Sequence, residues 1–254
     1  MNFKVLSNDG KARVGELKTV YGKIDTPVFM PVGTLASVKG ITKQILEKLD
    51  LNIILANTYH LMLRPGVDII KESGGLNKFM SWTKPILTDS GGFQIMSLGK
   101  NVNVDNDGVT FRSHIDGKKV RLDAEKAIDI QFNIGSTISM IFDECVPFPY
   151  SYNDTEESLR RSIKWSKRSK MFYKKREGYG IFGIIQGGMY KELRKISVQK
   201  NLENDFDGYA IGGLAVGEAK EQLTDITSFT SKLLPKNKPR YLMGVGYPED
   251  ILNA

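Results

Sequence analysis

The sequence predicts an α/β fold, a (β/α)8 TIM-type barrel, because short apolar runs alternate with segments of helical spacing. Seven runs are apolar enough to be strands buried on both faces: residues 27–34, 53–58, 86–89, 139–143, 181–186, 208–213 and 240–244. Amphipathic segments follow most of them, at residues 42–49, 124–133, 154–176, 191–202 and 218–234. This alternation is typical of a parallel sheet whose strands are joined by helical crossovers.

Two observations favour a barrel over an open, doubly wound sheet. Seven repeats is a high number for one open sheet, and polar or glycine residues follow nearly every run, where barrel enzymes place their active sites. A closed barrel has eight strands, whereas the sequence offers about seven before it ends at Ala254. We therefore expect a single, incomplete barrel domain over residues 1–254, with two strand edges left unpaired.

Two segments lie outside the alternation. Residues 1–26 are mixed and polar, and we expect a small antiparallel sheet ahead of the barrel. Residues 99–121 alternate in strand fashion around 106–108 (Asn-Asp-Gly) and 116–117 (Asp-Gly), which are good hairpin turns. This pattern predicts a small β-insertion over the mouth of the barrel. Its basic side chains include Lys118, Lys119 and Arg121.

Length and composition limit the classes of protein. A chain of 254 residues can bury one large core, and its 36 Lys and Arg against 29 Asp and Glu give a net charge of +7, which favours a polyanionic partner without identifying one. Cys145 is the only cysteine, which excludes an intramolecular disulfide and a Cys-rich zinc site within the chain. No apolar leader and no apolar run of ~20 residues is present, so we expect a cytoplasmic protein without a membrane partner.

Polar and glycine residues follow four of the predicted strands. They are Asp89, Asp143, Gln186 and the pair Gly213-Leu214. In a barrel these groups would converge on one site of two carboxylates, one amide and an exposed backbone. Such a set suits a flat heterocycle with several N–H donors, such as a purine, because a carboxylate accepts a pair of donors and an amide offers both a donor and an acceptor.

The stretch around Asp89 also has a purely structural interpretation. Asp89 and Ser90 are followed by Gly91 and Gly92, which let the backbone turn sharply. Taken alone, Asp-Ser-Gly is typical of a strand-end aspartate that caps its own turn. The other strand-end groups favour a binding site instead. We expect Phe93 and Met243, also near strand ends, to pack on the two faces of a bound ring.

Three further features are less specific. Nine basic residues follow the acidic start of the helix predicted at 154–176, and they form either a solvated helix face or a ridge that tracks phosphates. The loop 244–250 follows a strand and opens a helix, so its backbone N–H groups could meet a phosphate. His60 and His114 have no metal-ligand spacing, and we interpret both as structural.

Six motifs in this order resemble the tRNA-guanine transglycosylase (queuine tRNA-ribosyltransferase) family over essentially the whole chain. The motifs are Asn57-Thr58-Tyr59-His60-Leu61, Thr88-Asp89-Ser90-Gly91-Gly92-Phe93-Gln94, Phe142-Asp143-Glu144-Cys145, Ile185-Gln186-Gly187-Gly188, Gly212-Gly213-Leu214-Ala215-Val216-Gly217-Glu218 and Tyr241-Leu242-Met243-Gly244-Val245-Gly246. The resemblance implies a (β/α)8 barrel that exchanges guanine at the wobble position of tRNAs with GUN anticodons for a 7-deazaguanine. Leu214-Ala215-Val216 looks like the bacterial form, which takes preQ1.

The resemblance also implies roles for particular residues. Asp89 matches the family's catalytic proton acceptor. The substrate-binding positions are Asp89, Ser90, Gly91, Gly92, Phe93, Asp143, Gln186, Gly213, Leu214 and Met243. The RNA-binding positions are Gly244, Val245, Gly246, Tyr247, Pro248, Glu249 and Asp250. The implied partners are the tRNA anticodon loop, guanine, preQ1 and a second copy of the chain in a homodimer.

The implied chemistry is a double displacement on an extruded nucleotide. A carboxylate attacks the anomeric carbon to form a glycosyl-aspartate, guanine leaves, and a base removes the N9 proton of the incoming deazaguanine. No redox or nucleotide cofactor is needed. The family's nucleophilic aspartate and its structural zinc site of three Cys and one His would fall beyond Ala254. We therefore expect that residues 1–254 by themselves hold no metal and do not exchange bases.

Two other functions compete with this one. A non-catalytic, tRNA-binding partner subunit of a transglycosylase need not keep a base site, so the presence of both Asp89 and Asp143 argues against it. A glycosidase on the same barrel should show paired acids ~5–10 Å apart. That alternative gives no reason for the exposed backbone at 212–213 or for the basic helix.

Overall fold

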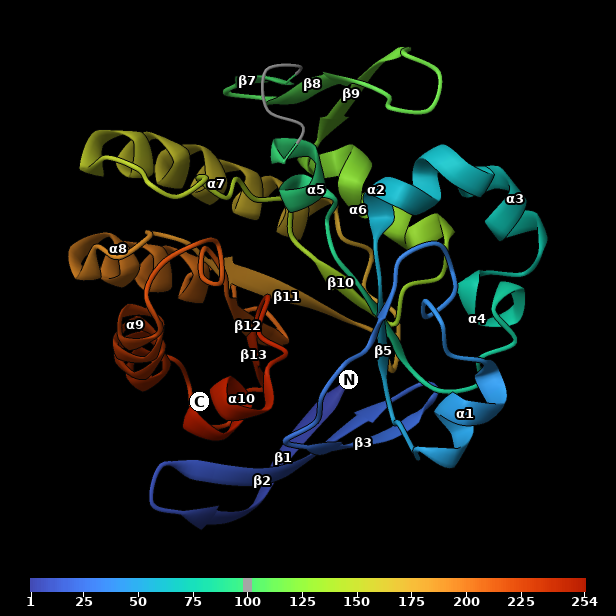
Figure 1. Ribbon diagram of the computed structural model, residues 1–254, viewed down its shortest axis with the longest axis horizontal. Coiled ribbons are helices and arrows are strands. Elements are labelled where there is room, and N and C mark those ends of the chain that lie inside the picture. Colours follow the sequence, from blue (N-terminus) through green and yellow to red (C-terminus); the bar gives the residue numbers. More distant parts are fainter. Residues whose placement is uncertain (98–101) are drawn as a thin grey trace.

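The computed structural model describes residues 1–97 and 102–254 (Figure 1). Its centre is a curled parallel sheet of seven strands, which forms part of a barrel, in the order β13-β12-β11-β10-β6-β5-β4. The strands are β4 (Val32–Gly33), β5 (Ile54–Ala56), β6 (Ile86–Thr88), β10 (Ile138–Met140), β11 (Gly180–Ile185), β12 (Gly208–Ile211) and β13 (Arg240–Leu242). All neighbouring pairs are parallel, which confirms the predicted fold class and a TIM-type barrel with one strand missing.

Helices pack around the outside of this sheet (Figure 1). They include α1 (Lys43–Lys48), α6 (Ala124–Asn133), α7 (Tyr152–Phe172), α8 (Lys191–Leu202) and α9 (Lys220–Leu233). The predicted bounds of α6 and α8 are confirmed. Helix α7 begins two residues earlier than predicted because the side chains of Ser151 and Asp154 form a capping box with each other's backbone N–H. None of the helices in the described ranges is long and apolar enough to cross a membrane.

Several short helices were not predicted. Between β5 and β6 the chain forms α2 (Thr58–Leu61), the irregular turn η1 (Met62–Gly66), α3 (Val67–Glu72) and α4 (Leu76–Phe79). Pro65 and the glycines at 66, 74 and 75 interrupt the helical spacing, so no long periodic pattern marks this region. Another short helix, α5 (Gly92–Met96), follows a strand, whereas α10 (Pro248–Asn253) is the helix expected to open at the loop 244–250.

The amino-terminal segment is the predicted antiparallel sheet, formed by β1 (Asn2–Asp9), β2 (Ala12–Thr19) and β3 (Gly22–Thr26). Its inward side chains, Leu17 and Ile24, belong to the same buried cluster as Ile53 and Ile138, which lie at the amino-terminal ends of barrel strands. This small sheet therefore covers the end of the barrel opposite to the strand exits.

The β-insertion is confirmed as a second antiparallel sheet of β7 (Val102–Asp105), β8 (Gly108–Arg112) and β9 (Lys119–Asp123). Residues 99–101 of the predicted insertion lie outside the described residues. Val109, Phe111 and Leu122 turn inward and join a core cluster with Trp165 of α7. The insertion is thus packed onto the carboxyl-terminal side of the barrel rather than extended into solvent (Figure 1).

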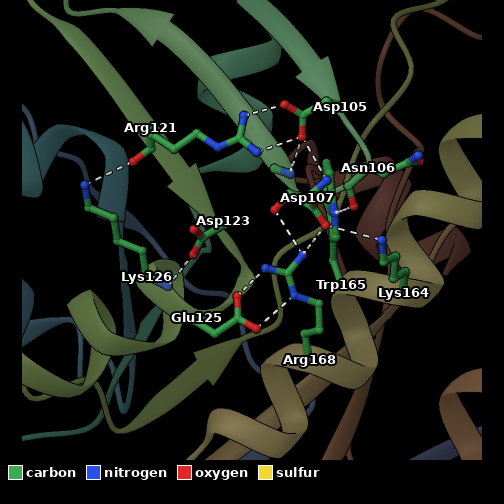
Figure 2. A network of polar contacts seen from close by, with 11 residues as sticks. Asp105, Asn106, Asp107, Arg121, Asp123, Glu125, Lys126, Lys164, Trp165 and Arg168 are labelled. Atoms are coloured by element: carbon green, nitrogen blue, oxygen red, sulfur yellow. Dashed lines mark hydrogen bonds and ion pairs between the residues drawn. The ribbon is translucent and has the colours of Figure 1, made fainter.

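A polar network ties this insertion to α6 and α7 (Figure 2). Arg121 donates to both carboxylate oxygens of Asp105, at 2.6 and 2.7 Å. Arg168 of α7 donates to Glu125 of α6 and to Asp107 at the hairpin turn. The indole Nε1 of Trp165 donates to the carbonyl oxygen of Asn106 at 2.9 Å. Arg121, one of the predicted basic residues of the insertion, is therefore occupied within the protein.

The two edge strands, β4 and β13, have no neighbour on their outer side among the described strands. A cavity of about 480 Å³ lies between them and is lined mainly by apolar side chains. Val32 from β4, Leu242 from β13 and Phe182 from the barrel interior all contribute to it. The expected pair of open edges and the partly open interior are therefore both present.

Candidate functional site

Five of the residues selected from the sequence lie within three residues of the carboxyl end of a barrel strand. Asp89 comes after β6, Asp143 after β10, Gln186 after β11, Gly213 after β12 and Met243 after β13. Because all these strands are parallel neighbours, their carboxyl ends open on the same side of the molecule. The structure therefore brings these groups to one mouth, beneath the β-insertion.

Three polar side chains at this mouth, those of Ser90, Asp143 and Gln186, are connected by hydrogen bonds. The hydroxyl of Ser90 donates to Oδ1 of Asp143 at 3.3 Å. Nε2 of Gln186 donates to Oδ2 of Asp143 at 2.7 Å. Asp143 is 7% exposed and Gln186 5% exposed, so both are largely withdrawn from water. A buried carboxylate is thus held between a hydroxyl and an amide.

Burial raises the pKa of Asp143 to about 6. The hydrogen bonds from Gln186 and Ser90 oppose this shift, whereas the nearby charges of Asp89 and Glu144 add to it. A carboxyl group with such a pKa changes its charge just below neutral pH, which is common for groups in functional sites.

Asp89 is held by residues from the neighbouring strand end. Its Oδ1 accepts from the backbone N–H of Thr58 at 2.9 Å and of Gly91 at 3.0 Å, and its Oδ2 accepts from Nδ2 of Asn57. Burial raises the pKa of Asp89, while these hydrogen bonds act in the opposite direction. Asn57 and Thr58 belong to the motif at 57–61, but no role at the site was predicted for them.

Two glycines permit close approaches within the site. A Cβ at Gly92 would lie 2.5 Å from the backbone carbonyl oxygen of Asp143, so any side chain there would displace one of the two loops. Gly213 has a φ of +65°, and a Cβ on it would collide with Oε1 of Gln186. The loops after β6, β10, β11 and β12 can therefore pack this tightly only with glycine at these positions.

The two apolar residues expected to face a ring lie in different surroundings. Met243 is half-buried, and its Sδ would lie 3.4 Å from a Cβ built on Gly212. Phe93 is 52% exposed on α5, so its ring lies largely in solvent. Leu214, the third apolar residue of the predicted site, is 4% exposed.

Arg194 was missed by the sequence analysis. It lies on α8, is fully buried, and donates to the carbonyl oxygens of Ile185, Gly188, Gly212 and Gly213. The sequence does contain a signal for its burial. Arg194 shares the helical spacing of the other buried residues of α8, which are Leu193, Ser197, Val198 and Asn201.

The basic residues of α7 largely have partners within the protein. Arg161 forms a bidentate pair with Glu144, which is 6% exposed and follows Asp143. Arg168 pairs with Glu125, and Lys164 with Asp107. These contacts favour a helix face whose charges are satisfied internally over a continuous ridge that tracks phosphates.

The loop 244–250 lies at the same mouth. Gly244 has a φ of +79°, and a Cβ on it would lie 3.1 Å from Cβ of Ala215 in the loop after β12. Tyr247 is 70% exposed. Nζ of Lys220 on α9 lies 2.9 Å from Oε1 of Glu249 and 3.4 Å from Oδ1 of Asp250, so these two acids face a lysine.

The histidines have neighbours but do not form a metal centre. The hydroxyl of Tyr59 lies 2.7 Å from Nδ1 of His114, and the rings of His60 and His114 are 5.9 Å apart. Within residues 1–97 and 102–254, no three His, Cys, Asp or Glu side chains are grouped closely enough to hold a metal ion. The described residues therefore do not supply the three-Cys, one-His donor set that the resemblance implies for zinc.

The chain is similar to known proteins of one family. The family model described as queuine tRNA-ribosyltransferase matches residues 8–254. A queuine tRNA-ribosyltransferase of Natranaerobius thermophilus is 56% identical over 248 residues, which are 98% of this chain and 67% of that protein. Those of Rickettsia typhi and Bacillus subtilis are 52% and 51% identical, over 100% and 96% of this chain and 70% and 64% of their own lengths. The chain thus spans about two thirds of the length of these relatives.

Proposed function

Because the chain belongs to the queuine tRNA-ribosyltransferase family, we propose that residues 1–254 form the base-recognition part of a tRNA-guanine transglycosylase. The observation that supports this most directly is the buried carboxylate of Asp143, held between Ser90 and Gln186 at the mouth of the barrel. An ionised Asp143 can accept two hydrogen bonds from the adjacent N–H groups of a guanine edge.

The other residues of the site have complementary roles in this proposal. Gln186 offers an amide beside Asp143, and the loop at Gly213-Leu214 offers backbone groups to the base edge. Met243 packs on one face of the ring. Asp89 takes the N9 proton of the incoming base, so that the ring nitrogen can attack the anomeric carbon. Its raised pKa favours accepting a proton.

We further propose that the exchanged base is the wobble guanine of tRNAs with GUN anticodons and that preQ1 replaces it. The target nucleotide must leave its stack to reach the mouth, and the loop 244–250 contacts the RNA backbone beside it. The resemblance assigns the covalent step to an aspartate outside residues 1–254. These residues by themselves would then bind a base without exchanging it, and in the working enzyme they act in a cytoplasmic homodimer.

Base selectivity tests the recognition part of this proposal. We expect the purified chain to bind guanine and 7-deazaguanine in equilibrium dialysis, and to bind adenine at least about 100-fold more weakly. Adenine would leave the buried Asp143 and Gln186 without matching donors, which is costly in a site built from polar groups. Equal binding of guanine and adenine would contradict the proposal.

A second assay tests the assignment of the covalent step. Residues 1–254 alone should incorporate no labelled guanine into tRNA, even where they bind free guanine. Measurable incorporation would show that a nucleophile is present within these residues and would overturn that assignment.

The pKa of Asp143 predicts how guanine binding depends on pH. Because the ionised carboxylate accepts the N–H groups of guanine, the affinity should fall about tenfold per pH unit below pH 6. Asp143→Asn should abolish this dependence.

The effect of the same pKa on the free energy of unfolding has the opposite sign. A carboxyl group whose pKa is raised by folding stabilises the native state most below its unfolded pKa, and this contribution is lost as the pH rises through 6. Urea unfolding of both proteins between pH 4 and 7 would measure it, and an unchanged guanine affinity across this range would contradict the role of Asp143.

A further inference from the structure

Arg194 is a buried cation that binds two loops at once. Its Nη1 donates to the carbonyl oxygen of Ile185 at 2.9 Å and of Gly212 at 2.8 Å. Its Nε donates to Gly188 at 2.8 Å, and its Nη2 reaches Gly213 at 3.4 Å. One guanidinium therefore connects the chain after β11 with the chain after β12.

The charge of Arg194 has no direct counter-ion among the described residues. The acceptors found for its guanidinium among these residues are backbone carbonyl oxygens. Burial lowers the pKa of Arg194 to about 10, the more distant charge of Glu218 opposes this shift, and Arg194 remains charged at neutral pH. Leaving a buried cation without partners is costly, so such a group persists only where hydrogen bonds replace its hydration. Here four backbone carbonyl dipoles do so.

The two connected loops carry the base-reading groups of the proposed function. Gln186 lies between the two acceptors Ile185 and Gly188, and its amide contacts Asp143. Gly213 lies against Oε1 of Gln186. The carbonyl group of Gly213 and the N–H of Leu214 belong to the same peptide group, so a shift of one moves the other. A displacement of either loop would therefore change both the Gln186–Asp143 contact and the backbone offered at 213–214.

We propose that Arg194 is a positioning residue that sets the distance between these two loops and thereby the fit of the base, an inference that rests on the function proposed above. It acts through Gln186 and the Gly213-Leu214 backbone and does not touch the substrate. The planar fork of arginine can address both loops together, whereas the single ammonium of lysine keeps the charge without that geometry.

Arg194→Lys tests the proposal, and Arg240→Lys is the matched control. Arg240 lies at the opposite end of the barrel, at the start of β13, and also donates to backbone carbonyls, those of Leu234 and Pro235. Burial lowers its pKa to about 10 as well. We expect Arg194→Lys to weaken guanine binding by about 10- to 100-fold, as the loss of a hydrogen bond between the base and a charged group would. Guanine binding by Arg240→Lys and tRNA binding by both variants should stay within about twofold of the unchanged chain.

Amide hydrogen exchange without any base provides a readout that is independent of the proposed function. Arg194→Lys should speed exchange in peptides that cover residues 185–188 and 212–214, and Arg240→Lys should not. If the unchanged chain fails to bind guanine but both loops loosen in Arg194→Lys, the proposed function fails while the link between the loops stands.

Three results would overturn the proposal. The first is guanine binding by a folded Arg194→Lys variant that equals that of the unchanged chain. The second is an equal loss in Arg194→Lys and Arg240→Lys. The third is global unfolding of both Arg194→Lys and Arg194→Met while Arg240→Lys folds, because Arg194 would then hold the barrel rather than the site.

Discussion

Replacing Glu144 with alanine should lower the free energy of unfolding by about 3–5 kcal/mol, because it removes the bidentate partner of Arg161 and leaves only the exposed Glu157, at 3.8 Å. Arg161 donates to the two carboxylate oxygens of Glu144 at 2.6 and 3.0 Å. The side chain of Glu144 is 7% exposed and that of Arg161 22% exposed, so water can replace only part of the lost interaction. We expect the value near 3 kcal/mol, since Arg161 retains some contact with solvent. Urea unfolding followed by circular dichroism would measure it.

Glu156→Ala is the matched control for this variant. Glu156 pairs with Arg160 on the same helix at 3.4 Å, but the arginine is 74% exposed. Removing an exposed i,i+4 pair should change the free energy of unfolding by less than about 0.5 kcal/mol. Equal effects of the two substitutions would mean that the Glu144–Arg161 pair is screened by solvent, in contradiction to its burial.

The strands and the longer helices could be predicted because burial leaves a local pattern. Strands buried on both faces are continuous apolar runs, and α6 has one largely apolar face with clear ends. Helix α8 keeps the helical spacing in Leu193 and Val198, although polar residues share its buried face. The segment between β5 and β6 has no such pattern. Its helices are four to six residues long and are separated by Pro65 and by glycines, so tertiary packing around Leu61, Ile70 and Leu76 stabilises them rather than local preference.

The candidate site could be predicted where its residues lie just after the carboxyl ends of strands. Parallel strands bring Asp89, Asp143 and Gln186 to the same edge of the sheet, whatever the details of side-chain packing. The positions of these residues after successive strands are therefore sufficient to predict that they lie together. Arg194 and Asn57 could not be assigned in this way. Arg194 binds backbone carbonyls, which leave no mark in the sequence, and Asn57 meets Asp89 from 32 residues away along the chain.

The basic helix shows a different limit of sequence reasoning. The sequence shows that Arg161 and Arg168 are positive charges on one segment. It does not show that the fold pairs them with Glu144 and Glu125. Net charge and local charge density therefore overestimate the basic surface that remains for a polyanion. The cations that remain exposed for the proposed contact with RNA have to be identified after the internal pairs are known.

Gly92→Ala should weaken guanine binding by about 100-fold while leaving a folded protein. In a helix, alanine is normally more stable than glycine by about 1 kcal/mol. At this position the new Cβ would lie 2.5 Å from the backbone carbonyl oxygen of Asp143, and neither backbone can rotate away as a flexible side chain could. The loop that carries Asp143 must then shift, which moves its carboxylate relative to Ser90 and Gln186. Loss of its charge-assisted hydrogen bonds to the base would cost a factor of about 100 in affinity.

The sign of the stability change separates this steric effect from helix propensity. If the contact with Asp143 dominates, Gly92→Ala should lower the free energy of unfolding by about 1–3 kcal/mol, as overpacking does, instead of raising it. Gly33→Ala is the control, because a Cβ at Gly33 would lie 3.4 Å from its nearest neighbours, the carbonyl oxygen of Leu55 and Cε of Met80. This distance is an ordinary van der Waals contact, so the guanine affinity of Gly33→Ala should match that of the unchanged chain. The contrary outcome is a Gly92→Ala protein that is more stable and binds guanine normally. It would show that the loops after β6 and β10 are not in close contact, although the proposed base recognition depends on that contact.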